Sequence, residues 1–277
     1  MDKLYHSVCI QCSRLITKRY STSFSMGIRV FEKKFRDPVY AIYGFVRFAD
    51  EIVDTFHGKN KKALLERFRK DTYAALDEGV SLNPVLHSFQ HVVNIYGIER
   101  EHIDAFLDSM EMDLYEVTYD CDGLKKYIYG SAEVVGLMCL KVFCHEVGNY
   151  DELKDYACAL GSAFQKINFL RDIQSDFKDR GRTYFPDIDF NCFTEKEKLE
   201  IEEDIKKDFD YAYIGIRKLP KGVRLGVYLA YVYYIQLFSK IKNASPEKIK
   251  SSRIRVRNRR KIYLLAKSTV KHRLDLL

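Results

Sequence analysis

GSAFQKINFLRDIQSDFKDRGRTYFP, residues 161–186, combines a long apolar helix pattern with a row of amides and carboxylates. No Gly or Pro interrupts residues 162–180, and apolar residues recur with helical spacing, which predicts a helix. On that helix a stripe roughly 80° wide holds Gly161, Gln165, Asn168, Asp172 and Asp176. The remaining surface is mainly apolar, which is typical of a buried helix. Two buried carboxylates repel each other and lose hydration, so the stripe predicts shared cations; a solvated acidic face is the alternative.

A second stripe of the same kind lies in VYAIYGFVRFADEIVD, residues 39–54. Around a helix, Asp54, Arg47 and Tyr43 all fall within about 60° of Asp50. One pair of Asp residues four apart is common by chance, but two pairs in apolar helices, each near an Arg, indicate a joint site. Mg²⁺ prefers carboxylate and phosphate oxygens, and Arg offers phosphate a fixed fork of donors. The pattern therefore predicts a magnesium and phosphate site between facing helices, because the Glu-x-x-His pairs of a di-iron site do not accompany these acids.

Composition predicts an all-α, single-domain helical bundle over residues 1–277. The chain is 47% hydrophobic with only 14 Gly and 5 Pro, which suits long helices around one core. No apolar run reaches the ~18 residues needed to cross a bilayer. Helices are expected over 3–20, 37–54, 60–77, 83–95, 99–117, 122–144, 151–179, 195–216, 220–243 and 246–274.

The cysteines and histidines predict no metal or redox centre. The seven Cys are odd in number and no signal peptide precedes them, so we expect free thiols in a reducing cytoplasm. Cys9 and Cys12 form a lone C-x-x-C without a second pair. His87 and His91 stand four apart without the acid of a zinc motif, so they are expected to be ordinary helix residues.

Positive charge is concentrated at the C-terminal end. The net charge is +7, and residues 251–277 hold nine Lys/Arg and one Asp, leaving 37 basic and 38 acidic residues elsewhere. A basic helix over about 250–274 is either a solvated face or a patch that docks on anionic lipid, on the cytoplasmic face of the membrane. No DNA- or RNA-binding module accompanies it, so no nucleic acid partner is expected.

The motifs together resemble the squalene/phytoene synthase family, most of all its bacterial phytoene synthase branch. Its second signature is matched by Gly161-x-Ala163-x-Gln165-x-x-Asn168-x-x-Arg171-Asp172-x-x-x-Asp176 and by Arg182-x-Tyr184-x-Pro186. Its first aspartate motif is matched by Tyr43-x-x-x-Arg47-x-x-Asp50-Glu51-x-x-Asp54. Further matches, collinear over residues 14–261, are Ser21-x-Ser23-Phe24, Tyr129-x-x-Ala132-x-x-Val135-Gly136, Tyr233 and Arg253.

The resemblance implies an isoprenoid synthase fold with a central cavity and head-to-head prenyl transfer. Two geranylgeranyl diphosphates would condense to phytoene through a cyclopropylcarbinyl diphosphate, with Mg²⁺ or Mn²⁺ assisting diphosphate release and without NADPH. The alternatives are a dehydrosqualene or squalene synthase using farnesyl diphosphate, and a non-catalytic assembly factor of the same fold. The implied partners are prenyl diphosphates and a carotenoid enzyme that accepts the product.

The resemblance also implies roles for particular residues. The metal ligands would be Asp50, Asp54, Asp172, Asp176 and Glu51. The catalytic residues would be Tyr43, Arg47, Tyr129, Arg171 and Tyr184. The substrate-binding residues would be Ser21, Ser23, Phe24, Gln165, Asn168, Tyr233 and Arg253. Arg171 lies about 100° from Asp172 on an ideal helix, Glu133 is expected to face the cavity beside Tyr129, and Lys166 is expected to point away from the polar stripe.

Overall fold

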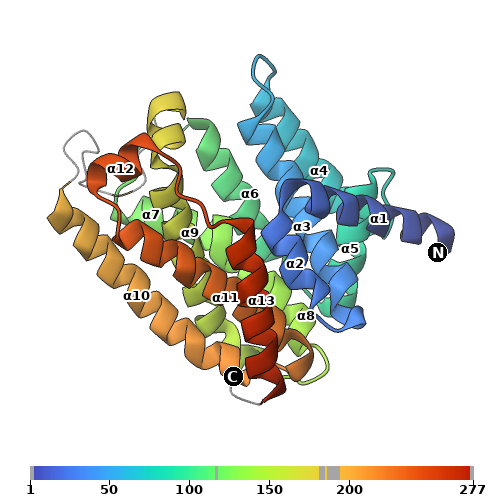
Figure 1. Ribbon diagram of the computed structural model, residues 1–277. Helices are drawn as coiled ribbons and strands as arrows, with labels where there is room; N and C mark the ends of the chain where they lie inside the picture. The colour runs from blue at the N-terminus through green and yellow to red at the C-terminus, as the bar shows by residue number, and fades with distance from the viewer. Residues whose placement is uncertain (1–2, 116–117, 181–184, 186–193, 275–277) are drawn as a thin grey trace.

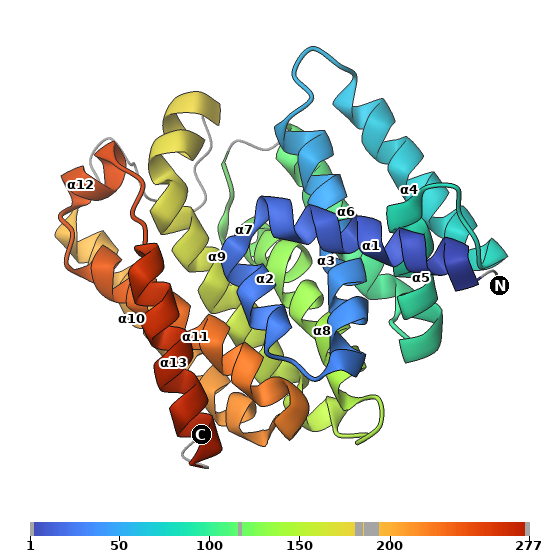
Figure 2. The same ribbon diagram turned by 45° about the vertical axis from the view of Figure 1, so that its right-hand side comes forward.

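A computed structural model of the chain describes residues 3–115, 118–180, 185 and 194–274, apart from the side chains of 174–180 and 250. These residues form α-helices and one π-helical turn, with no β-strand among them, so the predicted all-α class is confirmed (Figures 1 and 2). In chain order the elements are α1 (Lys3–Tyr20), α2 (Thr22–Arg29), α3 (Lys33–Asp54), α4 (Lys61–Glu78), α5 (Pro84–Tyr96), α6 (Arg100–Tyr115), α7 (Cys121–Ile128), η1 (Tyr129–Glu133), α8 (Val134–Cys144), α9 (Tyr150–Arg180), α10 (Glu195–Lys218), α11 (Lys221–Lys242), α12 (Pro246–Ser251) and α13 (Asn258–Arg273).

The helices enclose two apolar clusters. One is formed mainly by α1, α3, α4, α5, α6 and α8, with single residues from α2, α9 and α11. At its centre the fully buried Phe45 ring stacks on Phe89 at 3.9 Å between centroids. The other joins α7, α9, α10, α11 and α12 around Ile167, Leu170 and Phe209. Burying each such side chain stabilises the fold by about 1.5–3 kcal/mol. Because α3 and the part of α9 from Ala163 onward contribute their apolar sides to different clusters, their polar stripes are left to face the region between the clusters.

The short helix α2 was not predicted. The polar run after Tyr20 ends α1 as expected, but Ser21 then caps a new helix by accepting a hydrogen bond from the Phe24 N–H at 3.1 Å. Side-chain oxygens of Ser are well suited to this position, since the first amides of a helix lack partners. One polar residue therefore both stops α1 and starts α2.

The single C-terminal helix predicted over 246–274 is wrong. Helix α12 ends at Ser251, residues 252–257 are not helical, and α13 begins at Asn258. In this connecting segment Arg253, Arg255 and Arg257 are exposed, whereas Val256 is buried. Such alternation has the period of extended backbone rather than of a helix, so the apolar residues reach the core only if the helix breaks.

One helical stretch in the described part of the chain, Cys121–Cys144, is long and apolar enough to cross a membrane by length and composition. The prediction that no run would reach this length was therefore wrong. Buried core helices meet the same criterion, and 56% of the window lies inside the fold, packed against α6 and α9. The six described cysteines are free thiols, as predicted.

A cluster of histidines joins α1 to α5. His6 lies against His91 at 4.0 Å between ring centroids and against His87 at 5.7 Å. His87 is fully buried; its Nδ1 accepts a hydrogen bond from the Ser81 N–H at 3.4 Å, and its Nε2 has no hydrogen-bond partner among the described residues. Burial lowers the pKa of both His87 and His91, and the neighbouring His6 lowers both further. The neutral imidazole is thus the form that fits this interface.

Acidification is expected to destabilise the protein through these histidines. Below the unfolded-state pKa of about 6.5, the unfolded chain binds protons that the folded chain does not, so the free energy of unfolding falls as pH drops. Each such His adds a slope of at most about 1.4 kcal/mol per pH unit. Between pH 7.5 and 5.5, the free energy of unfolding measured with urea should fall less for His87→Asn than for the unmodified chain. The Asn side chain keeps an acceptor for the Ser81 N–H. Replacement of the exposed His57 by Asn is the control; an unchanged slope in His87→Asn would contradict the explanation.

Candidate active site

An apolar cavity of about 300 Å³ lies between the two clusters. Its walls come from α2, α3, η1, α8, α9, α10 and α11. Most of the lining is aliphatic or aromatic, and the polar side chains on it include Gln165 and Asn168 of α9 together with Tyr43 of α3 and Tyr234 of α11. The cavity therefore has apolar walls and a group of polar side chains, three from the two predicted stripes and one, Tyr234, from α11.

Helix α3 brings an arginine and two acids to the polar end of the site. Arg47 donates to Asp50 at 2.6 Å and also pairs with Glu51, while its guanidinium lies 4.4 Å from the centre of the Tyr20 ring. Burial lowers the pKa of Arg47, but Asp50 and Glu51 outweigh that effect and the pKa is raised overall. For Glu51, burial raises the pKa, but hydrogen bonds to the carboxylate, first of all from Arg47, lower the pKa to below its usual value. Both partners of the Arg47–Glu51 pair thus stay ionised.

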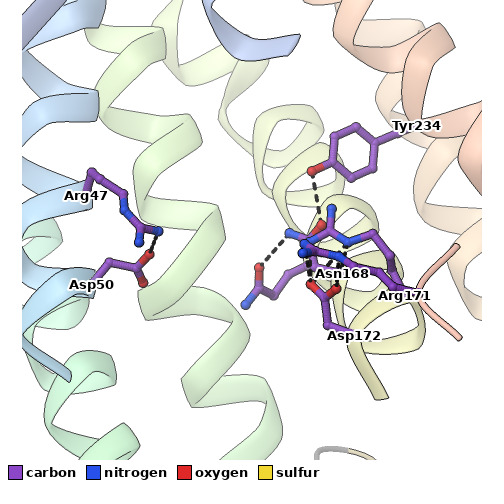
Figure 3. A network of polar contacts seen from close by, with 8 residues as sticks. Arg47, Asp50, Asn168, Arg171, Asp172 and Tyr234 are labelled. Carbon is purple, nitrogen blue, oxygen red and sulfur yellow. Dashed lines mark hydrogen bonds and ion pairs between the residues drawn. The ribbon is translucent and has the colours of Figure 1, made fainter. Parts of the chain in front are cut away.

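Helix α9 presents the matching group from the other side. Figure 3 shows Asn168, Arg171 and Asp172 turned toward Arg47 and Asp50 of α3. Arg171 Nε donates to both carboxylate oxygens of Asp172 at 3.1 Å, so this side chain bends back along the helix and reaches the site despite its angular offset. The Asp172 carboxylate therefore lies among cations although its side chain is only 18% exposed.

Arg253 brings the C-terminal segment into the same site. Its Nε lies 2.8 Å from Asp172 Oδ1, across a separation of 81 residues in sequence. The non-helical backbone of 252–257 makes this contact possible, because Arg253 lies in this segment, ahead of the first turn of α13. Asp172 is thus paired with one arginine of its own helix and one from the C-terminal segment.

A second set of hydrogen bonds joins polar side chains of the cavity lining. Tyr234 donates to Asn168 Oδ1 at 3.1 Å, and Asn168 Nδ2 donates to Gln165 Oε1 at 3.4 Å (Figure 3). The Tyr234 ring stacks on Phe164 with 3.8 Å between centroids. Tyr234 and Phe164 were not among the predicted site residues. Helical spacing is the sequence feature that could have identified Tyr234. It stands four residues after Ala230 and seven after Val227, which line the same wall of the cavity.

The predicted catalytic residue Tyr43 and the predicted substrate-binding residues near α2 and on α11 fall in two groups. Ser23, Phe24 and Tyr43 line the cavity, and the Phe24 and Tyr43 rings stack at 4.9 Å. Burial raises the pKa of Tyr43, so its hydroxyl stays protonated. Ser21 instead caps α2, and Tyr233 lies outside the cavity lining, with its ring edge-on to Tyr234 and beneath the Lys261 ammonium.

The structure does not bring Tyr129 into the cavity lining. Its side chain is 39% exposed, and burial together with the nearby Cys158 and Glu133 raises its pKa. The reason is the π-helical turn, closed by a hydrogen bond from the Val134 N–H to the Tyr129 carbonyl. One extra residue in this turn rotates Tyr129 away from the face that Gly136 shares with the cavity.

The expectations for Glu133 and Lys166 have different outcomes. Glu133 was expected to face the cavity, but it is not part of the lining. It hydrogen-bonds Cys158, which also lies outside the lining, and burial raises the pKa of the Glu133 carboxyl to about 6. Lys166 points away from the polar stripe as predicted, with its Nζ 2.8 Å from Asp208 of α10.

The predicted acids have the chemistry of a site for a hard divalent cation. Asp50 and Asp54 stand four apart on α3, Asp172 of α9 faces Asp50 (Figure 3), and Glu51 is held by Arg47. Among the described residues no three His, Cys, Asp or Glu side chains converge on one point. Mg²⁺ is usually held by one or two carboxylates together with substrate phosphates, so the donor set fits without such convergence. The Asp176 side chain and Tyr184 lie outside the described residues.

Small residues let the helices around the cavity approach closely. A Cβ on Gly161 would lie 2.9 Å from the Ala132 carbonyl oxygen and from Glu133 Cα, and one on Gly136 would lie 3.2 Å from the Ala157 carbonyl oxygen. Ala132, Gly136 and Leu140 also line the cavity. The glycines therefore serve close packing and cavity shape together.

The family model for squalene/phytoene synthase matches residues 17–260, which include both aspartate motifs and Arg253. The chain belongs to the squalene/phytoene synthase family. Members of this family are prenyltransferases that join prenyl diphosphates head to head, generally with a divalent metal ion.

Individual relatives carry several different names within the squalene/phytoene synthase family. The chain is 32% identical over 175 residues to a presqualene diphosphate synthase from Rhodopseudomonas palustris, covering 60% of this chain and 58% of the relative. It is 27% identical to a 4,4'-diapophytoene synthase from Staphylococcus haemolyticus (70% and 67% covered) and 33% identical to a phytoene synthase from Pseudescherichia vulneris (56% and 53% covered). The sequence matches thus span little more than half of two of these relatives and two thirds of the third.

Solved structures of the family share the fold. A dehydrosqualene synthase crystallised with a ligand superposes with a TM-score of 0.80 at 20% identity, covering 96% of both chains. A squalene synthase from Alicyclobacillus acidocaldarius superposes with a TM-score of 0.76 at 20% identity, covering 87% of this chain and 95% of that one. The predicted isoprenoid synthase fold is therefore confirmed.

Replacing Gly161 by Ala should destabilise the protein by about 1–3 kcal/mol, because the new methyl group would overpack the backbone of the π-turn. Elsewhere in a helix the same change would be favourable by about 1 kcal/mol. Gly27→Ala in α2 is the control, since its Cβ would meet its nearest neighbour at an ordinary 3.6 Å. Chemical denaturation of both variants measures the difference, and equal stabilities would contradict the close approach of α9 to η1.

Proposed function

We propose that this chain is a Mg²⁺-dependent phytoene synthase that condenses two geranylgeranyl diphosphates head to head. The observation that supports this most strongly is the facing arrangement of Arg47 and Asp50 on α3 with Asn168, Arg171 and Asp172 on α9, beside an apolar cavity. A diphosphate needs the cations and the metal ligands, whereas a polyprenyl chain needs apolar walls. The site offers both to one substrate.

The charged end suits the loss of diphosphate. Arg47, Arg171 and Arg253 each pair with an acid of the site, so their guanidinium forks lie where the leaving group would collect its charge. Asp50, Asp54 and Asp172, with Asp176 by resemblance, would hold Mg²⁺, and bound Mg²⁺ supplies Lewis-acid assistance to the departing diphosphate. Glu51 is committed to Arg47 and would orient that arginine.

The cavity suits the cation that follows. C1 of the ionised substrate bonds to the double bond of the second substrate, and loss of a proton gives the cyclopropylcarbinyl diphosphate. Loss of the second diphosphate, rearrangement and loss of another proton give phytoene without a reductant, so no NADPH is required. Apolar walls keep water from these cations, and the ring faces of Phe24, Tyr43, Phe164 and Tyr234 can stabilise them.

Purified protein with Mg²⁺ and geranylgeranyl diphosphate, without reductant, should release phytoene and inorganic diphosphate. Product analysis by liquid chromatography and mass spectrometry tests this, with farnesyl diphosphate assayed in parallel. Turnover of farnesyl diphosphate alone would replace the proposal by a dehydrosqualene synthase or, if NADPH is required for the final product, a squalene synthase. Inactivity with both substrates, in protein whose fold is verified by circular dichroism, would favour the non-catalytic assembly factor.

Asp50→Asn and Asp172→Asn should each lower kcat/KM by about 100-fold or more, the usual cost of losing one strong electrostatic contact to a reacting group. Raising the Mg²⁺ concentration should recover part of the loss if metal binding is what was weakened. Asp77→Asn is a matched control, because Asp77 pairs with Arg100 on the exposed surface. Wild-type rates in either site variant would remove that Asp from the proposed site.

A further inference from the structure

Helix α13 lies on the outside of the protein, along α11 (Figures 1 and 2). Its inward side includes the buried residues Leu264 and Ser268. The opposite side is not covered by any described part of the chain. The helix is therefore held in place by one face and presents the other to its surroundings.

The uncovered face of α13 carries large apolar side chains. Ile262 is 62% exposed, Tyr263 50%, Val270 56% and, just after the helix, Leu274 63%. On a helical wheel these four positions fall within an arc of about 120°. Single exposed apolar residues are ordinary, but several on one face of one helix indicate a surface that contacts something apolar.

Cations accompany these apolar residues. Arg259, Lys267 and Arg273 are exposed within or beside the same arc, and Arg260 adjoins it. No Asp or Glu occurs in residues 251–274, whereas the rest of the chain is close to neutral. The field of this region is thus positive and is not cancelled locally. A second copy of the same face would be repelled, and a nucleic acid backbone would leave the apolar side chains in water.

Helices α11 and α13 connect this face to the cavity. Gly226, Val227, Ala230 and Tyr234 of α11 line the cavity, and α13 packs on the outer side of α11. Two layers of helix therefore separate the outer face from the site. Under the proposed function, substrates and product carry long apolar chains that partition into bilayers, so a membrane at this face would hold the cavity close to their source.

We propose that the exposed face of α13, formed by Arg259, Ile262, Tyr263, Lys267, Val270, Arg273 and Leu274, docks on an anionic lipid bilayer. Helices that lie in a membrane interface combine an apolar stripe with flanking Lys and Arg. Each cation near an anionic surface contributes about 1 kcal/mol, which is roughly fivefold in binding. The apolar side chains would enter the boundary of the headgroups while the cations contact lipid phosphates.

Vesicle binding by the full chain tests this without reference to activity. Sedimentation with vesicles of phosphatidylcholine alone, or mixed equally with phosphatidylglycerol, should show binding to the anionic vesicles only, weakened by salt. The triple variant Arg259→Gln, Lys267→Gln, Arg273→Gln should bind roughly 100-fold more weakly. The double variant Ile262→Ser, Val270→Ser keeps every charge and should lose at least about tenfold. Leu82→Ser is the control, because Leu82 is 95% exposed on the loop before α5.

Three results would overturn the proposal. They are equal binding to neutral and anionic vesicles, wild-type binding by the triple variant, and wild-type binding by the double variant, which would indicate electrostatic adhesion without a docked helix face. Circular dichroism and thermal unfolding show whether each variant is folded. Activity on detergent-dispersed substrate should be unchanged in both variants, so failure of vesicle binding and failure of the proposed function would be observed separately.

Discussion

The structure depends on pairing carboxylates with arginines on helices that are otherwise built to be buried. Asp172 is only 18% exposed, and an acid in such a place is costly unless a cation compensates it. Arg171 supplies one cation from the preceding position, and Arg253 supplies another from the far end of the sequence. On α3, Arg47 does the same for Asp50 and Glu51. This need for compensation ties α3, α9 and the C-terminal segment to one place.

The cavity follows from how the two apolar clusters divide the helices. Helix α3 gives its apolar face to the cluster around Phe45, and α9 gives its own to the cluster around Ile167. The region between the clusters then receives the polar stripes of both helices and the smaller apolar side chains of α8 and α11. A site with a charged end and apolar walls is formed as a consequence of packing, without a separate domain.

Close backbone approaches determine the shape of that cavity. Gly161 lets α9 lie against the π-turn, and Gly226 leaves room for the Phe31 ring, whose nearest atom would lie 2.2 Å from an added Cβ. The π-turn itself changes which side chains reach the interior. It removes Tyr129 from the lining while Ala132 and Gly136 stay in it, a result that depends on a single extra residue in one helical turn.

The sequence by itself determined the all-α class, most helix ranges and the two acidic stripes, because helical periodicity and amide or carboxylate spacing are local properties. It did not reveal the break before α13, the short helix α2 or the position of Tyr129. Tyr234 was missed in favour of its neighbour Tyr233 for the same reason: one residue along a helix is a rotation of 100°, and packing chooses which of the two faces inward. Only the tertiary structure decided that Arg253 meets Asp172, since a contact across 81 residues depends on how the whole chain folds back on itself.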